Sequence, residues 1–91
     1  MTTKKSYYKY YLREALDVFG ATMWLFEGVD LNPAQKKILA ARGISARAWT
    51  ALLNNESNIN SDELNIIAEI TKIPVYAPLM TPEEMQRVKV A

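Results

Sequence analysis

The sequence predicts an all-α fold, a compact bundle of about five helices. Apolar residues recur at three- and four-residue spacing in several segments, which is the period of an amphipathic helix. Residues that cap helices stand before these segments, and Gly or Pro residues stand where they end. The chain has 91 residues, of which 49% are hydrophobic, so we expect residues 1–91 to form a single domain.

The N-terminal segment predicts an amphipathic helix that Ser6 can cap. Its apolar stripe would consist of Tyr8, Tyr11, Leu12, Ala15, Leu16 and Phe19. Gly20 weakens or ends this helix, and residues 21–26 are expected to continue it or to form a second short helix closing near Gly28. Residues 29–33 are then expected to be a connection.

A first short helix is predicted over residues 33–42. Asn32 can cap it, and Pro33 suits its first position because the missing N–H has no helical partner there. Gly43 would end it in a left-handed conformation. The side chains expected to face the core are those of Ile38, Leu39 and Ala41.

A second short helix follows at once, and Ser45 can cap it by accepting a hydrogen bond from an amide near Ala48. Trp49 and Leu52 lie three residues apart and should face the core. The outer face would carry Ala46, Arg47, Thr50, Ala51, Leu53 and Asn54. Asn55 tolerates the left-handed conformation and is expected to end the helix. Two short helices joined by a Gly turn, here within residues 31–55, are typical of a helix-turn-helix, which lays one helix in the DNA major groove.

Two more helices are expected in the last third of the chain. Asn60 and Glu63 can form a capping box for residues 61–71. The buried stripe there would be Leu64, Ile67, Ala68 and Ile70. Pro74 would stop this helix, and residues 75–80 are expected to be extended. The run Thr81-Pro82-Glu83-Glu84 then opens a short C-terminal helix over residues 81–90.

The composition excludes several kinds of chemistry. The chain has no Cys, so disulfides, thiolate metal sites and a Cys nucleophile are excluded. It has no His, which removes the commonest general base and metal ligand. With no Gly-rich phosphate loop either, we expect no enzyme, no cofactor and no metal. The N-terminus shows no secretory signal, and the most apolar stretch, residues 18–31, is too short and too charged for a membrane, so a cytoplasmic protein is expected.

Charges alternate in blocks along the chain, although the net charge is only +1. Residues 1–13 and 31–55 carry bases and no acid, whereas residues 14–30 and 56–69 carry acids and no base. One basic block coincides with the two short helices, so that face would attract a polyanion. The alternative is an ordinary solvated surface whose charges alternate by chance.

The spacing of several motifs between Gln35 and Ala68 is that of a known family. These motifs are Gln35, Gly43-Ile44-Ser45, the pair Trp49 and Leu52, Asn54-Asn55, and the group Leu64, Ile67 and Ala68. In this ungapped frame the chain resembles the lambda-repressor-like, Cro/C1-type (XRE) helix-turn-helix domains. The resemblance implies a sequence-specific DNA-binding transcriptional regulator, a small repressor of the phage or mobile-element type. It would bind double-stranded DNA as a homodimer, read the major groove with residues 45–54, and need no cofactor.

The resemblance also assigns DNA contacts to Gln35, Lys36, Ser45, Ala46, Arg47, Thr50, Asn54 and Asn58. Gln35 and Ser45 would hold phosphates with help from the neighbouring lysines, and Arg47 would be the main base reader, since a guanidinium can bond O6 and N7 of guanine together. Thr50 would meet a thymine methyl, a base or a phosphate. Ala46 would allow close approach of the DNA, and Asn54 and Asn58 would lie near the DNA backbone.

Other interpretations of these residues remain open. Ser45 can be a cap alone, Arg47 a solvated charge and Gln35 an ordinary surface residue. The N-terminal tyrosines, with Lys4, Lys5 and Lys9 among them, can form a stacking platform, a DNA-reaching arm or part of the core. The alternative function is a helical protein-interaction or self-association module that keeps the fold without binding DNA. The exposed aromatic residues of the segment 19–26 or the C-terminal helix would then supply the contact surface.

Overall fold

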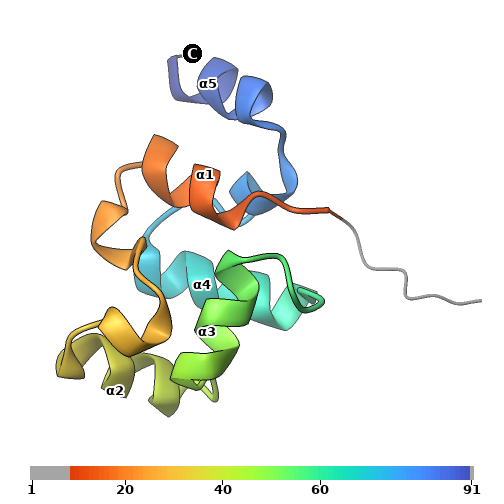
Figure 1. Cartoon of the computed structure of the whole chain (residues 1–91). Helices are drawn as coiled ribbons and strands as arrows, with labels where there is room; N and C mark the ends of the chain where they lie inside the picture. The colour runs from red at the N-terminus through yellow and green to blue at the C-terminus, as the bar shows by residue number, and fades with distance from the viewer. Residues whose placement is uncertain (1–8, 91) are drawn as a thin grey trace, which may run out of the picture.

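A computed structural model describes residues 9–90 of the chain (Figure 1). This range contains five α-helices, three short 3-10 turns and no strand. The α-helices are α1 (Leu12–Val18), α2 (Pro33–Ala41), α3 (Ala46–Leu53), α4 (Ser61–Thr71) and α5 (Pro82–Val90). The 3-10 turns are η1 (Thr22–Trp24), η2 (Gly28–Asp30) and η3 (Ala77–Leu79). The all-α prediction is therefore confirmed for the described residues.

The helices are arranged along the molecule in an order that differs from the sequence. In Figure 1, α2 and α3 lie at one end, α5 lies at the other, and α1 and α4 lie between them. The largest fully buried side chains come from all of the α-helices and from the segment before α1: Tyr10, Leu12, Leu16, Leu39, Trp49, Leu52, Ile67 and Met85. The rings of Trp24 and Trp49 meet edge to face, with centroids 5.8 Å apart. Trp49, predicted as core, is thus confirmed at the centre of the packing.

The predicted helix starts are confirmed at four places. In each, a cap side chain accepts a hydrogen bond from the backbone amide three residues further on, at 2.8 to 3.2 Å. The caps are Asn32, Ser45, Asn60 and Thr81. Each bond satisfies an amide that has no partner within its helix. Such a cap typically adds about 1 kcal/mol to the free energy of unfolding.

A left-handed residue follows each of the four helices α1 to α4. Gly20 follows α1 with φ of 82°, where the sequence predicted that it weakens or ends the helix. Gly43 follows α2 with φ of 83°, and Asn55 follows α3 with φ of 57°, both as predicted. Lys72, with φ of 68°, ends α4 before Pro74 is reached, so the proline is not the residue that stops this helix. The segment after Pro74 is not fully extended either, because it contains η3.

The segment before α1 departs from the prediction. The helix starts at Leu12, whereas the sequence pattern predicted a start near Ser6, which lies outside the described residues together with Tyr8. The amide of Tyr11 donates to the carbonyl of Pro78 at 2.7 Å, and the hydroxyl of Tyr10 donates to the carbonyl of Ser57 at 2.7 Å. These distant contacts hold residues 9–11 in a non-helical conformation.

Residues 21–33 also differ from the prediction. No helix forms over residues 21–26; η1 and η2 occupy this part of the chain, and η2 falls where a plain connection was expected. Three predicted side-chain orientations are wrong as well. Ile38, which is 44% exposed, and Ala41 face solvent, because Gln35 and Leu39 form the buried face of α2. Leu53, placed on the outer face of α3, is only 3% exposed.

No helix within residues 9–90 combines the length and the apolar character that a membrane span requires.

Candidate nucleic-acid interface

The candidate interface is built on α2, the turn after it and α3. The turn is held by its own backbone: the amide of Gly43 donates to the carbonyl of Ala40 at 3.0 Å, and the amide of Ile44 donates to that of Leu39 at 2.9 Å. Ile44 is buried and anchors the turn in the core. The first turn of α3 is consequently held in a fixed orientation relative to α2, with Ser45 exposed at its start.

One flank of α3 is covered by residues 22–31, which we call the strap. The indole Nε1 of Trp49 donates to the carbonyl of Phe26 at 3.1 Å. The amide of Gly28 donates to Oγ1 of Thr50 at 2.7 Å. Backbone groups of an irregular segment need partners when they are buried, and side chains of α3 provide them here.

Gly28 makes the closest approach between the strap and α3. A Cβ atom at this position would lie 1.9 Å from the carbonyl oxygen of Ala46, the first residue of α3. No side chain fits in that space, so glycine is required for packing and not for a left-handed φ. The strap thus packs against the backbone of Ala46, a residue predicted to allow close approach of DNA.

Two residues predicted to contact DNA are engaged by neighbouring parts of the protein. The hydroxyl of Thr50 donates to the carbonyl of Ala46 at 3.1 Å while accepting from Gly28. The side-chain amide of Asn54 accepts from Arg13 at 2.6 Å and donates to Glu27 at 3.3 Å. The hydroxyl of Thr50 is therefore used inside the fold, whereas the bonds of Asn54 are on the surface.

Gln35 is likewise part of the fold. Its side chain is buried, with 8% of the residue exposed. Its Nε2 donates to the carbonyl of Met23 at 2.8 Å, and its Oε1 accepts from the amide of Asn32 at 3.3 Å, which completes a capping box. The side chain predicted to hold a phosphate thus ties the strap to the start of α2.

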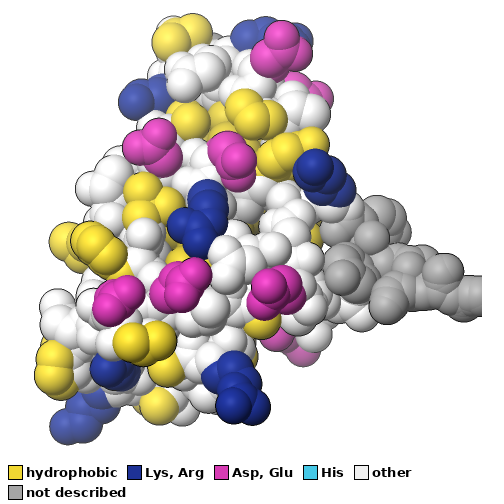
Figure 2. Space-filling model, viewed as in Figure 1, with side chains coloured by type: hydrophobic (Ala, Val, Ile, Leu, Met, Phe, Trp, Pro, Cys, Tyr) yellow, Lys and Arg dark blue, Asp and Glu magenta, His cyan; other side chains and the backbone are white. Residues whose placement is uncertain are grey.

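The adjacent face of α3 is open and carries Arg47. Arg47 is exposed, as are Lys36 and Lys37 on α2. The ion pairs within residues 9–90 are Arg13–Glu27 and Arg42–Glu69, so these three cations are unpaired in that range. Figure 2 shows Lys and Arg side chains at the end of the molecule where Figure 1 places α2 and α3, with a band of Asp and Glu side chains further up. Asn58 is exposed in the loop after the far end of α3.

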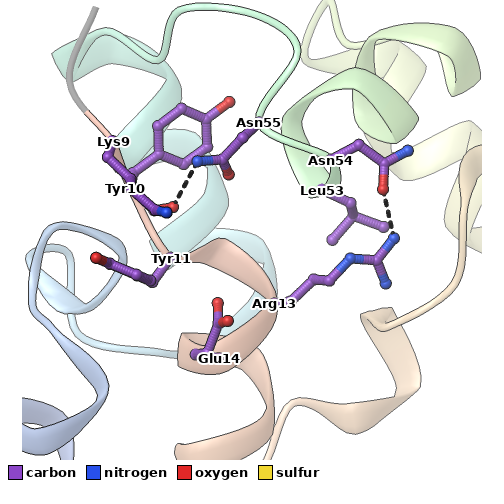
Figure 3. Close-up of a pocket in the computed structure, with 8 residues that line it drawn as sticks. All are labelled: Lys9, Tyr10, Tyr11, Arg13, Glu14, Leu53, Asn54 and Asn55. Carbon is purple, nitrogen blue, oxygen red and sulfur yellow. Dashed lines mark hydrogen bonds between the residues drawn. The ribbon is translucent and has the colours of Figure 1, made fainter.

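A shallow cavity of about 360 Å³ lies between the start of α1 and the end of α3 (Figure 3). It is lined by Lys9, Tyr10, Tyr11, Arg13, Glu14, Leu53, Asn54 and Asn55. Figure 3 shows Arg13 reaching from α1 to Asn54, and Asn55 donating to the carbonyl of Tyr10, at 2.8 Å. The ammonium of Lys9 lies 5.7 Å from the ring centroid of Tyr11. The cavity brings two cations next to the end of α3.

The sequence pattern did not indicate the part that Arg13 and the strap play beside α3. Arg13 belongs to the first basic block, but nothing local relates it to Asn54, a residue 41 positions away. The charged residues of the strap are Glu27 and Asp30, and nothing in the local sequence indicated that this segment packs against α3. Comparison with known proteins adds nothing to this geometry: no family model, no curated protein and no solved structure matches the chain.

Proposed function

We propose that the protein is a sequence-specific DNA-binding regulator of transcription that uses α2, the turn and α3 as a helix-turn-helix of the lambda-repressor-like kind. One observation carries the proposal: Arg47, in the first turn of α3, is exposed and has no ion pair among the described residues, and α2 exposes Lys36 and Lys37. No acidic residue occurs within residues 31–55 to oppose a polyanion. Such a surface suits the major groove and the phosphates that flank it.

In this proposal the first turn of α3 enters the major groove. Arg47 bonds a guanine through O6 and N7, which is the commonest specific contact between a side chain and a base. Ser45 and Lys36 meet phosphates on the same side, and Asn58 meets the backbone beyond the other end of α3. Because Thr50 and Gln35 are used inside the fold, few side chains remain for reading bases. Affinity per protomer is then modest, and a homodimer on two half-sites supplies the rest.

A protein-interaction module without DNA binding is the second candidate. It is favoured by the exposed apolar side chains that the strap and α2 present, namely Met23, Phe26, Val29 and Ile38. Scattered apolar residues are common on soluble proteins, whereas unpaired bases gathered around a helix start are a more specific feature. We therefore place DNA binding first.

Selection of bound duplexes from a random pool tests the proposal. A two-fold symmetric consensus is expected, with affinity that falls steeply as salt rises because bound counterions are released. Arg47→Ala should lower affinity for the selected duplex by about tenfold to a hundredfold and relax the preference for one guanine. Arg87→Ala, an exposed arginine on α5 at the other end of the molecule, is the matched control and should bind as the wild type does.

Two results would overturn the proposal. One is the absence of any duplex binding at low salt. The other is an equal loss of affinity in both arginine variants, since this would reflect net charge and not a base contact. Tight self-association without duplex binding would favour the interaction module.

A further inference from the structure

The strap packs against the first turn of α3. Gly28 contacts Thr50 and the backbone of Ala46, the first residue of the helix, and the carbonyl of Phe26 accepts from Trp49. The longer side chain of Glu27 accepts from Asn54, just after the helix. The residue after Gly28 lies beside that first turn, which is the part of the protein that we propose to enter the groove.

The geometry of η2 determines which residues there point outward. A 3-10 turn has three residues per turn, so residues three apart share a face. Gly28 faces the backbone of Ala46, and Leu31, three residues later, is buried. The residues between them, Val29 and Asp30, are exposed, and Val29 is 70% exposed. An apolar side chain thus stands in solvent next to the base-reading end of α3.

We propose that Val29 is a second base-reading residue, which contacts the 5-methyl group of a thymine in the major groove. This inference rests on the proposed function. Of the groups that base edges offer in the major groove, the thymine methyl is the apolar one, so it is the partner for a side chain without donors or acceptors. Gly28 fits tightly against Ala46, the residue before Arg47, so η2 lies next to the first turn of α3, and in this proposal the groove that receives Arg47 also receives Val29. Asp30, exposed beside Val29, would be repelled by a phosphate, so the proposal directs η2 at base edges and not at the DNA backbone.

Replacement of single thymines by deoxyuridine in the selected duplex tests the inference, because deoxyuridine pairs identically but lacks the methyl group. With the wild-type protein, one thymine in each half-site should be sensitive, and its replacement should lower affinity about fourfold, the value of one buried methyl-sized group. Val29→Ala should bind the thymine and deoxyuridine duplexes equally well. Val90→Ala, the same change at an exposed position on α5, should keep the fourfold difference.

The outcomes separate the two proposals. If Arg47→Ala relaxes the guanine preference but Val29→Ala and the wild type respond alike to deoxyuridine, Val29 reads no methyl and only this inference is overturned. The same holds if no thymine position is sensitive. If no duplex is selected at all, DNA binding fails and the role of Val29 fails with it. Unchanged circular dichroism of Val29→Ala confirms that any loss of methyl sensitivity is not a loss of fold.

Discussion

The two flanks of α3 are used in different ways. The flank with Ala46 and Thr50 packs against the strap, and Thr50 is hydrogen-bonded to it; Asn54, just beyond the helix, is bonded to α1 and to the strap. Within residues 9–90, the side chains of the flank with Arg47 and Ala51 make no such bond, and they are exposed or half-buried. Residues on the two flanks alternate along the same two turns of helix, about 100° apart for neighbours. One row of α3 side chains therefore fixes the helix to the rest of the protein, and the adjacent row remains available for binding.

The largest expected effect on the strap-facing flank comes from Gly28→Ala. Its Cβ would meet the backbone of Ala46, which cannot move aside as a flexible side chain can, so the free energy of unfolding should fall by about 3 kcal/mol or more. Urea unfolding measures this. Gly43→Ala is the matched control: its Cβ meets open space, and only the strain of a positive φ, about 1 kcal/mol, is expected. Equal losses in the two variants would show that the strap does not press on α3.

A smaller effect is expected from Thr50→Val. The variant keeps the shape of the side chain but leaves the amide of Gly28 without its partner, so the free energy of unfolding should fall by about 2 kcal/mol. Thr50→Ser retains the hydroxyl and should recover most of that loss. If the Val and Ser variants are equally stable, the hydrogen bond contributes nothing measurable to the flank.

The smallest effect is expected from Asn54→Ala. Its bonds to Arg13 and Glu27 are on the surface, where such interactions contribute about 0.5 kcal/mol. Arg47→Ala on the open flank should leave the free energy of unfolding unchanged within the error of the urea measurement. A larger loss of stability in Arg47→Ala than in Asn54→Ala would contradict the division of α3 into two flanks.

Local signals account for the parts of the fold that the sequence predicted. The caps at Asn32, Ser45, Asn60 and Thr81 act over three residues, so neighbouring sequence is enough to identify them. The left-handed positions at Gly43 and Asn55 are equally local. The helices that these signals delimit, α2 to α5, begin where the pattern placed them and end at or within a residue or so of it.

Distant contacts account for what the sequence did not predict. The strap takes its conformation from partners such as Trp49 and Thr50, which are more than 20 positions away, and no periodicity within residues 22–31 reveals them. Leu53 is buried because α1 and the segment before it lie over the end of α3. In the candidate site, helical periodicity predicted the exposure of Arg47. It did not predict that Gln35 and Thr50 are hydrogen-bonded to the strap, because those bonds depend on the conformation of the strap.

The close fit of Gly28 against Ala46 limits how the target preference of this protein can be redesigned. Exchanging α3 as a whole for a helix from another regulator would remove the hydroxyl of residue 50, which bonds the strap, and could shift the backbone of residue 46, against which Gly28 packs. A library should therefore vary positions 47 and 51 and hold 46 and 50 constant. Positions 29 and 30 can be varied alongside them, since neither side chain is buried. The variable surface of this scaffold thus spans two separate segments of the chain.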